Sequence, residues 1–266
     1  MHPPTSTQED PYVIRTDHQG IATLMLNRAQ QFNALSQAMI AALQAELDAI
    51  APDPAVRVVI IAGAGKAFCA GHDLREMRAN HHHAFMQDLF RRCGKMMTTL
   101  TQMPQPVIAR VHGIATAAGC QLVSMCDLAV AADSARFATS GINVGLFCST
   151  PAVALSRNLG RKQALELLLT GDFIDAPTAQ RQGLVNRVAP LDQLDTAVRH
   201  LADSIVNKSP LAIAMGKELF YRQLELGLEA AYACASEAMA CNMNSEDARE
   251  GIDAFIAKRK PEWKGR

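Results

Sequence analysis

The stretch that most constrains the fold runs from Val107 to Ala132, where a strand, a group of small residues, a short apolar helix and a second strand follow one another. Small residues at a strand-to-helix transition let the backbone approach a bound group closely. The start of a helix also leaves N–H groups without partners, next to the positive end of the helix dipole. The stretch therefore predicts either tight helix–sheet packing or a binding site for a negative oxygen.

A second stretch of the same kind decides between these two interpretations. Arg57–Ala62 is a near-continuous apolar run, which is typical of a strand buried on both faces. Gly63–Leu74 then forms another loop of small residues that leads into a helix. Two such loops can direct two backbone N–H groups at one oxygen, so together they favour a binding site.

The rest of the chain predicts an α/β part followed by an all-α part. Strands are predicted at Tyr12–Arg15 and Ile21–Leu26, and a helix capped by Ser36 follows them. Residues 75–103 are polar and rich in Met, and they predict a mobile helical cover. From Leu191 onward the chain is predicted to be helical, with breaks at Ser209-Pro210 and Gly227.

Composition excludes several functional classes. The 266 residues contain 26 Lys and Arg and 26 Asp and Glu, so no overall field favours nucleic acid or an anionic membrane as partner. No apolar run approaches the length of about 18 residues that predicts a membrane span. The N-terminal residues have no secretory pattern and predict a flexible leader over residues 1–11. Seven scattered cysteines indicate reduced thiols, and we expect a cytoplasmic protein.

Four ordered motifs resemble the crotonase (enoyl-CoA hydratase/isomerase) superfamily. They are Asn33-Ala34-Leu35, Phe68–Leu74, Ala117–Leu128 and Glu250–Pro261, and the resemblance spans roughly residues 12–263. It implies an α/β fold in which ββα units form a spiral over residues 12–189. It also implies a helical oligomerisation region over residues 190–266, which assembles trimers or dimers of trimers.

The resemblance implies an acyl-CoA thioester as ligand, with coenzyme A as part of the substrate and no separate cofactor or metal. The backbone N–H groups of His72 and Ala118 would hold the thioester carbonyl oxygen, in agreement with the two small-residue loops. The positions implied to bind substrate or CoA are Arg28, Ala34, Ala70, Asp73, Leu74, Ser140, Asn143, Phe255 and Lys258. Phe255 and Lys258 would come from a neighbouring subunit, and Asp73 has the alternative role of a helix cap.

The sequence departs from the family pattern at both glutamates that hydration uses. Gln121 and Gly141 stand at these two positions. Neither residue can take up a proton at pH 7, and general acid–base groups contribute roughly 10²–10⁴ each to a rate. We therefore expect weak or absent hydration of a simple enoyl-CoA.

Three functions stay open at this point. The first is another superfamily reaction, such as decarboxylation of a malonyl-type CoA thioester, since loss of CO₂ leaves the enolate without a base. The second is lyase or isomerase chemistry by polar groups near the pocket, among them the His72 side chain and Cys148. The third is binding of acyl-CoA without catalysis. His81-His82-His83 are interpreted as solvated rather than metal-binding, because adjacent helical residues point in different directions.

Overall fold

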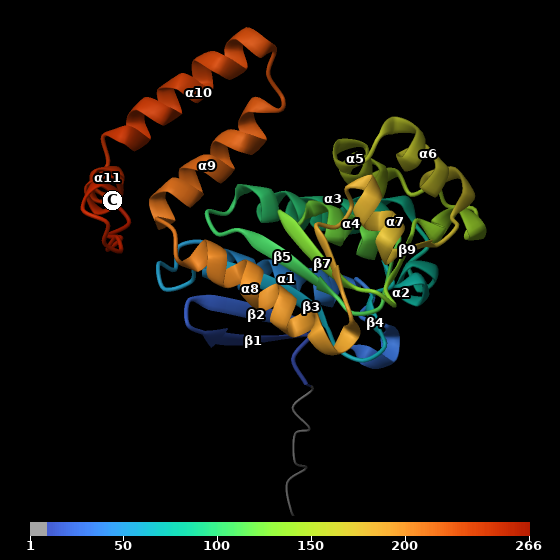
Figure 1. Ribbon diagram of the computed structural model, residues 1–266. Coiled ribbons are helices and arrows are strands. Elements are labelled where there is room, and N and C mark those ends of the chain that lie inside the picture. The colour runs from blue at the N-terminus through green and yellow to red at the C-terminus, as the bar shows by residue number, and fades with distance from the viewer. Residues whose placement is uncertain (1–9) are drawn as a thin grey trace, which may run out of the picture.

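The molecule is built around two β-sheets with helices packed against them (Figure 1). The computed structural model describes residues 10–266, so residues 1–9 of the predicted leader lie outside the described part of the chain. The larger sheet has the strand order β1 (Val13–His18), β2 (Ile21–Leu26), β3 (Val58–Gly63), β5 (Val107–Val111), β7 (Leu128–Ala132) and β10 (Arg187–Ala189). The smaller sheet has the order β4 (Ala67–Cys69), β6 (Ile114–Thr116), β8 (Arg136–Ala138) and β9 (Ile174–Asp175).

From β3 to β8, consecutive strands alternate between the two sheets, and each pair of strands leads into a helix. β3 is followed by β4 and α2 (Leu74–Ala79), β5 by β6 and α4 (Ala118–Met125), and β7 by β8 and, after a 3₁₀ turn at Ser140–Val144, α5 (Ser149–Asn158). Strands β2, β3, β5, β7 and β10 pair in parallel, as do β4, β6 and β8. These are ββα units, and the α/β fold expected from the resemblance is confirmed.

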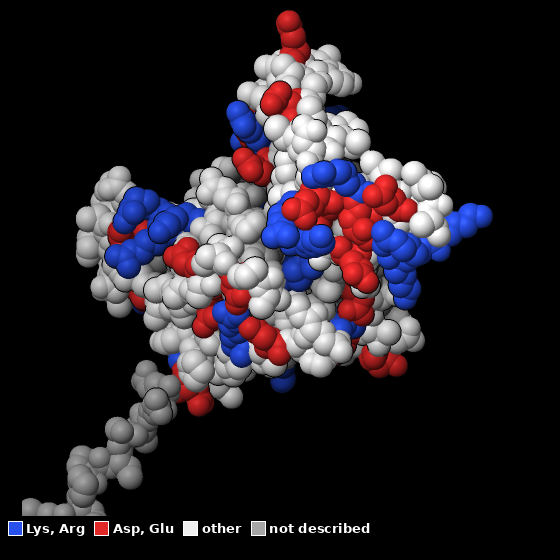
Figure 2. Space-filling view, turned by 90° about the vertical axis from the view of Figure 1, so that its left-hand side faces the viewer, with Lys and Arg blue, Asp and Glu red and all other residues white. Residues whose placement is uncertain are grey.

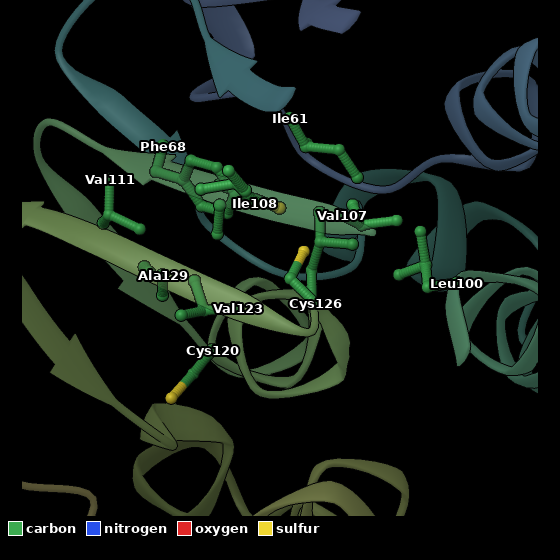
Figure 3. Packing of buried hydrophobic residues seen from close by; sticks show 14 of the residues in the cluster. Ile61, Phe68, Leu100, Val107, Ile108, Val111, Cys120, Val123, Cys126 and Ala129 are labelled. Atoms are coloured by element: carbon green, nitrogen blue, oxygen red, sulfur yellow. The ribbon is translucent and has the colours of Figure 1, made fainter. Parts of the chain in front are cut away.

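The core explains why the apolar runs form strands. All six residues of β3 are buried, as predicted for a strand covered on both faces. Figure 3 shows Phe68 of the small sheet among Ile61, Ile108 and Val111 of the large sheet, and all four belong to one buried cluster. The two sheets therefore share a core, and the ends of β4 and β6 are fixed by it.

The remaining helices cover the sheets and then leave them. They are α1 (Gln37–Ile50), α3 (His83–Gln102), α6 (Arg161–Thr170), α7 (Ala176–Gln182), α8 (Leu194–Val206), α9 (Pro210–Gln223), α10 (Leu228–Met243) and α11 (Glu246–Ile256). Short 3₁₀ turns precede α1 at Ala29–Gln31 and α8 at Leu191–Gln193. In α1 the Ser36 hydroxyl accepts from the Met39 N–H at 3.2 Å, so the predicted cap is confirmed.

A buried ion pair attaches α9 to the core. Lys217 on α9 donates to the Asp127 carboxylate at 2.6 Å and to the carbonyl oxygens of Leu100 and Gln105. The same carboxylate accepts from the Val107 N–H and from Tyr221. Beyond this attachment α9, α10 and α11 project from the body (Figure 1). Figure 2 shows that the top of this projection is mostly uncharged, whereas α11 and the tail that follows it are rich in charged residues of both signs. Within residues 10–266 no helix has the length and apolarity that a bilayer crossing needs.

Several sequence-based boundaries need correction. The first strand continues to His18, because the reversal uses only Gln19 and Gly20, both with positive φ. Strands β4 and β6 lie inside stretches that were predicted as loops. The cover at residues 75–103 is helical as predicted, but one face of α3 is buried in the core. Helix α8 packs against the large sheet, so the helices that project from the body begin at Pro210. A helix break that the sequence did not predict lies at Asn244-Ser245.

Candidate functional site

The two small-residue loops lie side by side because β4 and β6 are neighbouring parallel strands. Gly71, in the loop after β4, has φ +90°, and a Cβ on it would lie 3.1 Å from the Ala118 nitrogen and 2.8 Å from the Ala117 Cβ. Gly119 approaches even more closely, since a Cβ there would lie 2.0 Å from the Cys69 carbonyl oxygen. Only glycine permits these contacts, and they bring the start of α4 against the His72 loop.

Ala117 holds a strained conformation immediately before α4. Its φ of 50° and ψ of −122° lie in a region that residues with a side chain rarely adopt. Its N–H donates to the Ala138 carbonyl at 3.0 Å, which ties this turn to β8. Ala118 is the first residue of α4, where helical N–H groups have no intrahelical acceptor. The turn therefore directs the Ala118 N–H out of the helix end.

A pocket of about 370 Å³ opens between these loops, α3 and the segment that leads into α5. The two predicted oxygen-binding positions, His72 and Ala118, both line it, as do the predicted substrate positions Ala70, Leu74 and Ser140. The other lining residues are Met77, Phe90, Ala117, Gly141, Val144, Leu146, Phe147, Cys148, Ser149, Thr150 and Pro151. Among residues 10–266, no Asp, Glu, Lys or Arg contributes to this lining. The pocket is thus apolar with a few neutral polar groups.

Gly141 stands where its surroundings leave no space for a side chain. A Cβ on Gly141 would lie 2.7 Å from the Cys148 sulfur and 2.7 Å from the Leu146 carbonyl oxygen. The Leu146 N–H donates to the Gly141 carbonyl at 2.9 Å, and the Cys148 thiol donates to the Thr139 carbonyl. We call residues 141–148 the pocket loop. The pocket loop therefore occupies the space that a glutamate side chain at position 141 would need.

Gln121 lies deeper than the resemblance suggests. It is in the second turn of α4 and only 4% exposed, and it is not among the residues that line the pocket. Among the described residues its Oε1 has no hydrogen-bond partner. Burial raises the pKa of the Cys120 thiol beside it to about 12, so that cysteine stays protonated at pH 7.

The His72 side chain packs against Phe90, another residue of the pocket lining, and its imidazole is neutral. Its ring meets Phe90 edge-on, with centroids 5.2 Å apart and an interplanar angle of 79°. Burial lowers the pKa of the imidazole to about 4. Within the described chain, its buried Nε2 has no hydrogen-bond partner. The backbone segment around it is fixed, since the Leu35 N–H donates to the Gly71 carbonyl at 2.7 Å.

A second, open groove of about 710 Å³ lies on the other side of the His72–Leu74 segment. Arg28, Ala34 and Asp73 line it, so three predicted CoA positions come together there. The Arg28 guanidinium stacks 3.6 Å from the Tyr12 ring centroid and donates to the carbonyl oxygens of Asp10, Pro11 and Asn27. Asp73 accepts from the N–H groups of Arg75 and Glu76, so its predicted role as a helix cap is confirmed.

Three predicted binding positions do not join the pocket or the groove. Asn143 is exposed, its amide lies against Gly171, and it is not among the residues that line the pocket. Phe255, at the end of α11, is 84% exposed, and Lys258 follows it. Figure 1 shows α11 on the opposite side of the molecule from α2 and β4. Within one chain these two residues are far from the pocket.

The three adjacent histidines and the cysteines have structural rather than metal-binding surroundings within residues 10–266. His81, His82 and His83 are exposed as predicted, and the His82 ring caps α3 by accepting from the Phe85 N–H. No group of three His, Cys, Asp or Glu suited to a metal ion occurs within residues 10–266. All seven cysteines are free thiols.

Sequence reasoning missed Ala117 and most of the pocket loop. An alanine carries no sequence signal for positive φ, so the strained turn was not predictable. The apolar residues Val144, Leu146 and Phe147 did carry a signal, because they surround Gly145 in a segment without helical or strand periodicity.

Comparison with known proteins gives one consistent family. The Enoyl-CoA hydratase/isomerase family model matches residues 16–266. The mitochondrial enoyl-CoA hydratase domain-containing protein 3 of Xenopus laevis is 46% identical over 256 residues, which cover 96% of this chain and 87% of that protein. Within the superfamily, the segments Ala115–Val123 and Gly141–Leu155 resemble this protein in particular, and the identity over nearly the whole chain confirms that likeness.

Solved structures agree with the sequence relatives. An enoyl-CoA hydratase of Mycobacterium smegmatis superimposes with a TM-score of 0.94 at 57% identity, covering 96% of this chain and 99% of that chain. Human enoyl-CoA hydratase domain-containing protein 3 superimposes with a TM-score of 0.93 at 42% identity, covering 95% of this chain and all of the other.

Proposed function

We propose that this chain, which belongs to the enoyl-CoA hydratase/isomerase family, binds an acyl-CoA thioester in the pocket between His72 and Ala118. The backbone N–H groups of these two residues would hold the thioester carbonyl oxygen. The observation that carries the proposal is the approach of Gly71 to the Ala118 nitrogen, because it brings the two loops to one wall of one pocket.

The chemistry follows from the charge that a thioester oxygen gains. When the α-carbon loses a proton or a carboxyl group, the carbonyl becomes an enolate and its oxygen becomes negative. Two fixed donors in a site without competing charges stabilise that oxygen, and loss of one such donor typically costs on the order of 10²–10³ in rate. The pocket thus suits reactions that pass through an enolate.

Hydration of a simple enoyl thioester is expected to be weak. Positions 121 and 141 carry Gln and Gly, and within residues 10–266 no carboxylate lines the pocket to replace the family's pair. Decarboxylation of a malonyl-type thioester needs no base and is one candidate reaction. An isomerase or lyase reaction is another, and it would have to use the neutral groups of the pocket. Binding without turnover is the remaining candidate.

The wider setting of the chain is also part of the proposal. We propose that Arg28 lies beside the CoA phosphates, and that Phe255 and Lys258 reach the ligand from a neighbouring subunit of a homotrimer or dimer of trimers. A cytoplasmic location remains a prediction, and the name of the Xenopus relative assigns that protein to mitochondria.

The test is turnover and binding with a panel of CoA thioesters. Purified protein would be incubated with crotonyl-CoA, malonyl-CoA and methylmalonyl-CoA, with products followed by mass spectrometry and binding by calorimetry. We expect binding of CoA thioesters and at most slow hydration of crotonyl-CoA. A crotonyl-CoA turnover in the usual enzyme range of about 1–10³ per second would contradict the proposed loss of hydration. Failure of every thioester to bind would contradict the proposed ligand class.

A further inference from the structure

Asn33 is a fully buried polar side chain between the groove and the pocket. It is 0% exposed, and it belongs to the lining of neither cavity. Its backbone has a φ of +54°, in the left-handed region, which asparagine adopts more readily than most residues with a side chain. A buried amide whose hydrogen-bonding groups are all engaged stiffens the segments that it joins. The segments joined by Asn33 are those that carry the two cavities.

On the side of the groove, Asn33 fixes the backbone of Arg28. The Asn33 Oδ1 accepts from the Arg28 N–H at 2.9 Å, and the Asn33 N–H donates to the Arg28 carbonyl oxygen, also at 2.9 Å. These two bonds close a ring around the 3₁₀ turn at residues 29–31. Arg28 and Ala34, which flank this turn, both line the groove. The position of the Arg28 side chain therefore depends on Asn33.

On the side of the pocket, the Asn33 amide holds the loop and the strand that lead to His72. Its Nδ2 donates to the carbonyl oxygens of Ala64 and Ala67 at 2.9 Å, and to that of Phe68 at 3.2 Å. Ala67 and Phe68 belong to β4, the strand that ends just before the His72 loop. One side chain thus contacts the backbone on both sides of the cavity wall.

The residues next to this asparagine pair with the His72 loop itself. The Ala70 N–H donates to the Phe32 carbonyl oxygen at 3.0 Å, and the Leu35 N–H donates to the Gly71 carbonyl oxygen at 2.7 Å. Leu35 and His72 also form a parallel β-bridge. A single short segment therefore runs from the cation of the groove to the proposed oxygen-binding amide, and the buried asparagine lies in the middle of it.

We propose that Asn33 is a positioning residue, which sets the spacing between the Arg28 groove and the His72 amide so that one thioester engages both at once. This inference rests on the proposed function, because it takes the CoA phosphates to lie beside Arg28 and the thioester oxygen to lie at His72. A ligand that spans two sites gains affinity only if their spacing fits its length. Loss of the Asn33 contacts should therefore weaken a full CoA thioester more than a thioester that reaches the pocket alone.

Calorimetric titration with two thioesters of different length tests this inference. Butanoyl-CoA can reach both sites, whereas S-butanoylpantetheine lacks the phosphates and the adenosine and reaches only the pocket. We expect the wild type to bind butanoyl-CoA about a hundredfold more tightly than S-butanoylpantetheine, and the variant N33G to lower this ratio about tenfold. Because glycine suits a positive φ, the affinity of N33G for S-butanoylpantetheine should stay within about threefold of the wild type.

Two further variants show whether the effect belongs to this position. N33D keeps the size of the side chain but has no amide donor, so it should also lower the ratio, and it tests the same contacts if N33G does not fold. Q105A is the matched control, because the Gln105 amide is likewise buried and donates to three carbonyl oxygens, within residues 50–53. Q105A should lose stability but keep the affinity ratio of the wild type.

The outcomes separate this inference from the function beneath it. An unchanged ratio in folded N33G or N33D, an equal loss of affinity for both thioesters, or the same fall of the ratio in Q105A would overturn the positioning role of Asn33 and leave thioester binding intact. Equal affinities of the wild type for the two thioesters would overturn the Arg28 groove as the CoA site, and this inference with it. Failure of both thioesters to bind would overturn the proposed function itself.

Discussion

Three residues determine the chemistry of the pocket. Two of them lack a side chain, and the third has a ring nitrogen without a hydrogen-bond partner among residues 10–266. Gly71 has no side chain and so lets two backbone donors approach each other. Gly141 has none, and the pocket loop fills the space. His72 has an imidazole that burial keeps neutral. Each of these features predicts a measurable result for a single substitution.

Substitution of Gly71 by alanine should disrupt the site. Its φ of +90° and the 2.8 Å separation from the Ala117 Cβ mean that G71A is both strained and crowded. We expect a loss of about 1–3 kcal/mol in the free energy of unfolding and weaker thioester binding. Urea denaturation and calorimetry measure these effects. The matched control is G183A, at φ +91° with the Asn158 carbonyl oxygen 3.3 Å from the new Cβ, which is outside the pocket lining and should show strain but unchanged binding. Equal binding losses in both variants would contradict the specific role of Gly71.

Restoring the family's glutamates should not restore hydration. In the variant G141E the Cβ meets the Cys148 sulfur and the Leu146 carbonyl oxygen, so the pocket loop must move. We expect the double variant Q121E/G141E to hydrate crotonyl-CoA no faster than Q121E, and to be less stable by about 1–3 kcal/mol. A spectrophotometric hydration assay decides the first point. G94A, which meets nothing within 4 Å in α3, serves as a stability control and should be neutral or slightly stabilising. A hundredfold gain in the double variant over Q121E would disprove this explanation.

The neutral state of His72 predicts how stability changes with pH. Because the pKa is about 4 in the folded protein and near 6.5 in the unfolded chain, the unfolded state binds more protons between these values. The free energy of unfolding should therefore rise from pH 4 to pH 6.5, with a contribution from this residue on the order of 3 kcal/mol. Denaturation of the wild type and H72Q across this range isolates the contribution. The exposed His81, tested as H81Q, should behave like the wild type.

At the scale of the element, long buried segments were predictable and short ones were not. The strands at β3, β5 and β7 and the helix α1 follow directly from apolar runs and periodicity. β4, β6 and β8 have three residues each, too few for any periodicity, and they exist because neighbouring strands pair with them. The two loops of the site were found because glycine and alanine mark them in the sequence. Their mutual approach depends on this second sheet, so its geometry could not be inferred.

The attachment of α9 predicts a large effect of one buried cation. Lys217 satisfies two carbonyl oxygens and the Asp127 carboxylate, so K217M leaves a buried charge and two acceptors without a donor. We expect a loss of about 3–5 kcal/mol in the free energy of unfolding, measured in urea. Y221F removes one hydrogen bond to the same carboxylate and should cost about 1 kcal/mol. K162M, at an exposed position of α6, is the control, and a comparable loss there would contradict the prediction.

At the scale of the whole molecule, the resemblance predicted the fold class but only part of the site. The pocket and the groove lie on either side of the His72–Leu74 segment, and together they contain nine of the positions predicted from sequence. These are the predicted catalytic positions His72, Ala118 and Gly141 and the predicted binding positions Arg28, Ala34, Ala70, Asp73, Leu74 and Ser140. Asn143 lies outside the pocket lining because it stands in a 3₁₀ turn, which directs successive residues around an axis. Phe255 and Lys258 belong to another part of the molecule, which no local pattern in a single chain can bring to the pocket.

The projecting region that carries α11 away from the pocket has a consequence for measurements in dilute solution. If Phe255 and Lys258 complete the ligand site of a neighbouring copy, then each copy contributes the pocket of one site and these two residues to another. The apparent dissociation constant for a thioester should then increase as the protein is diluted below the concentration at which its subunits separate. Fluorescence titration over a thousandfold range of protein concentration, with sedimentation in parallel, measures both changes. An affinity that stays constant while the assembly falls apart would show that each chain holds its ligand alone.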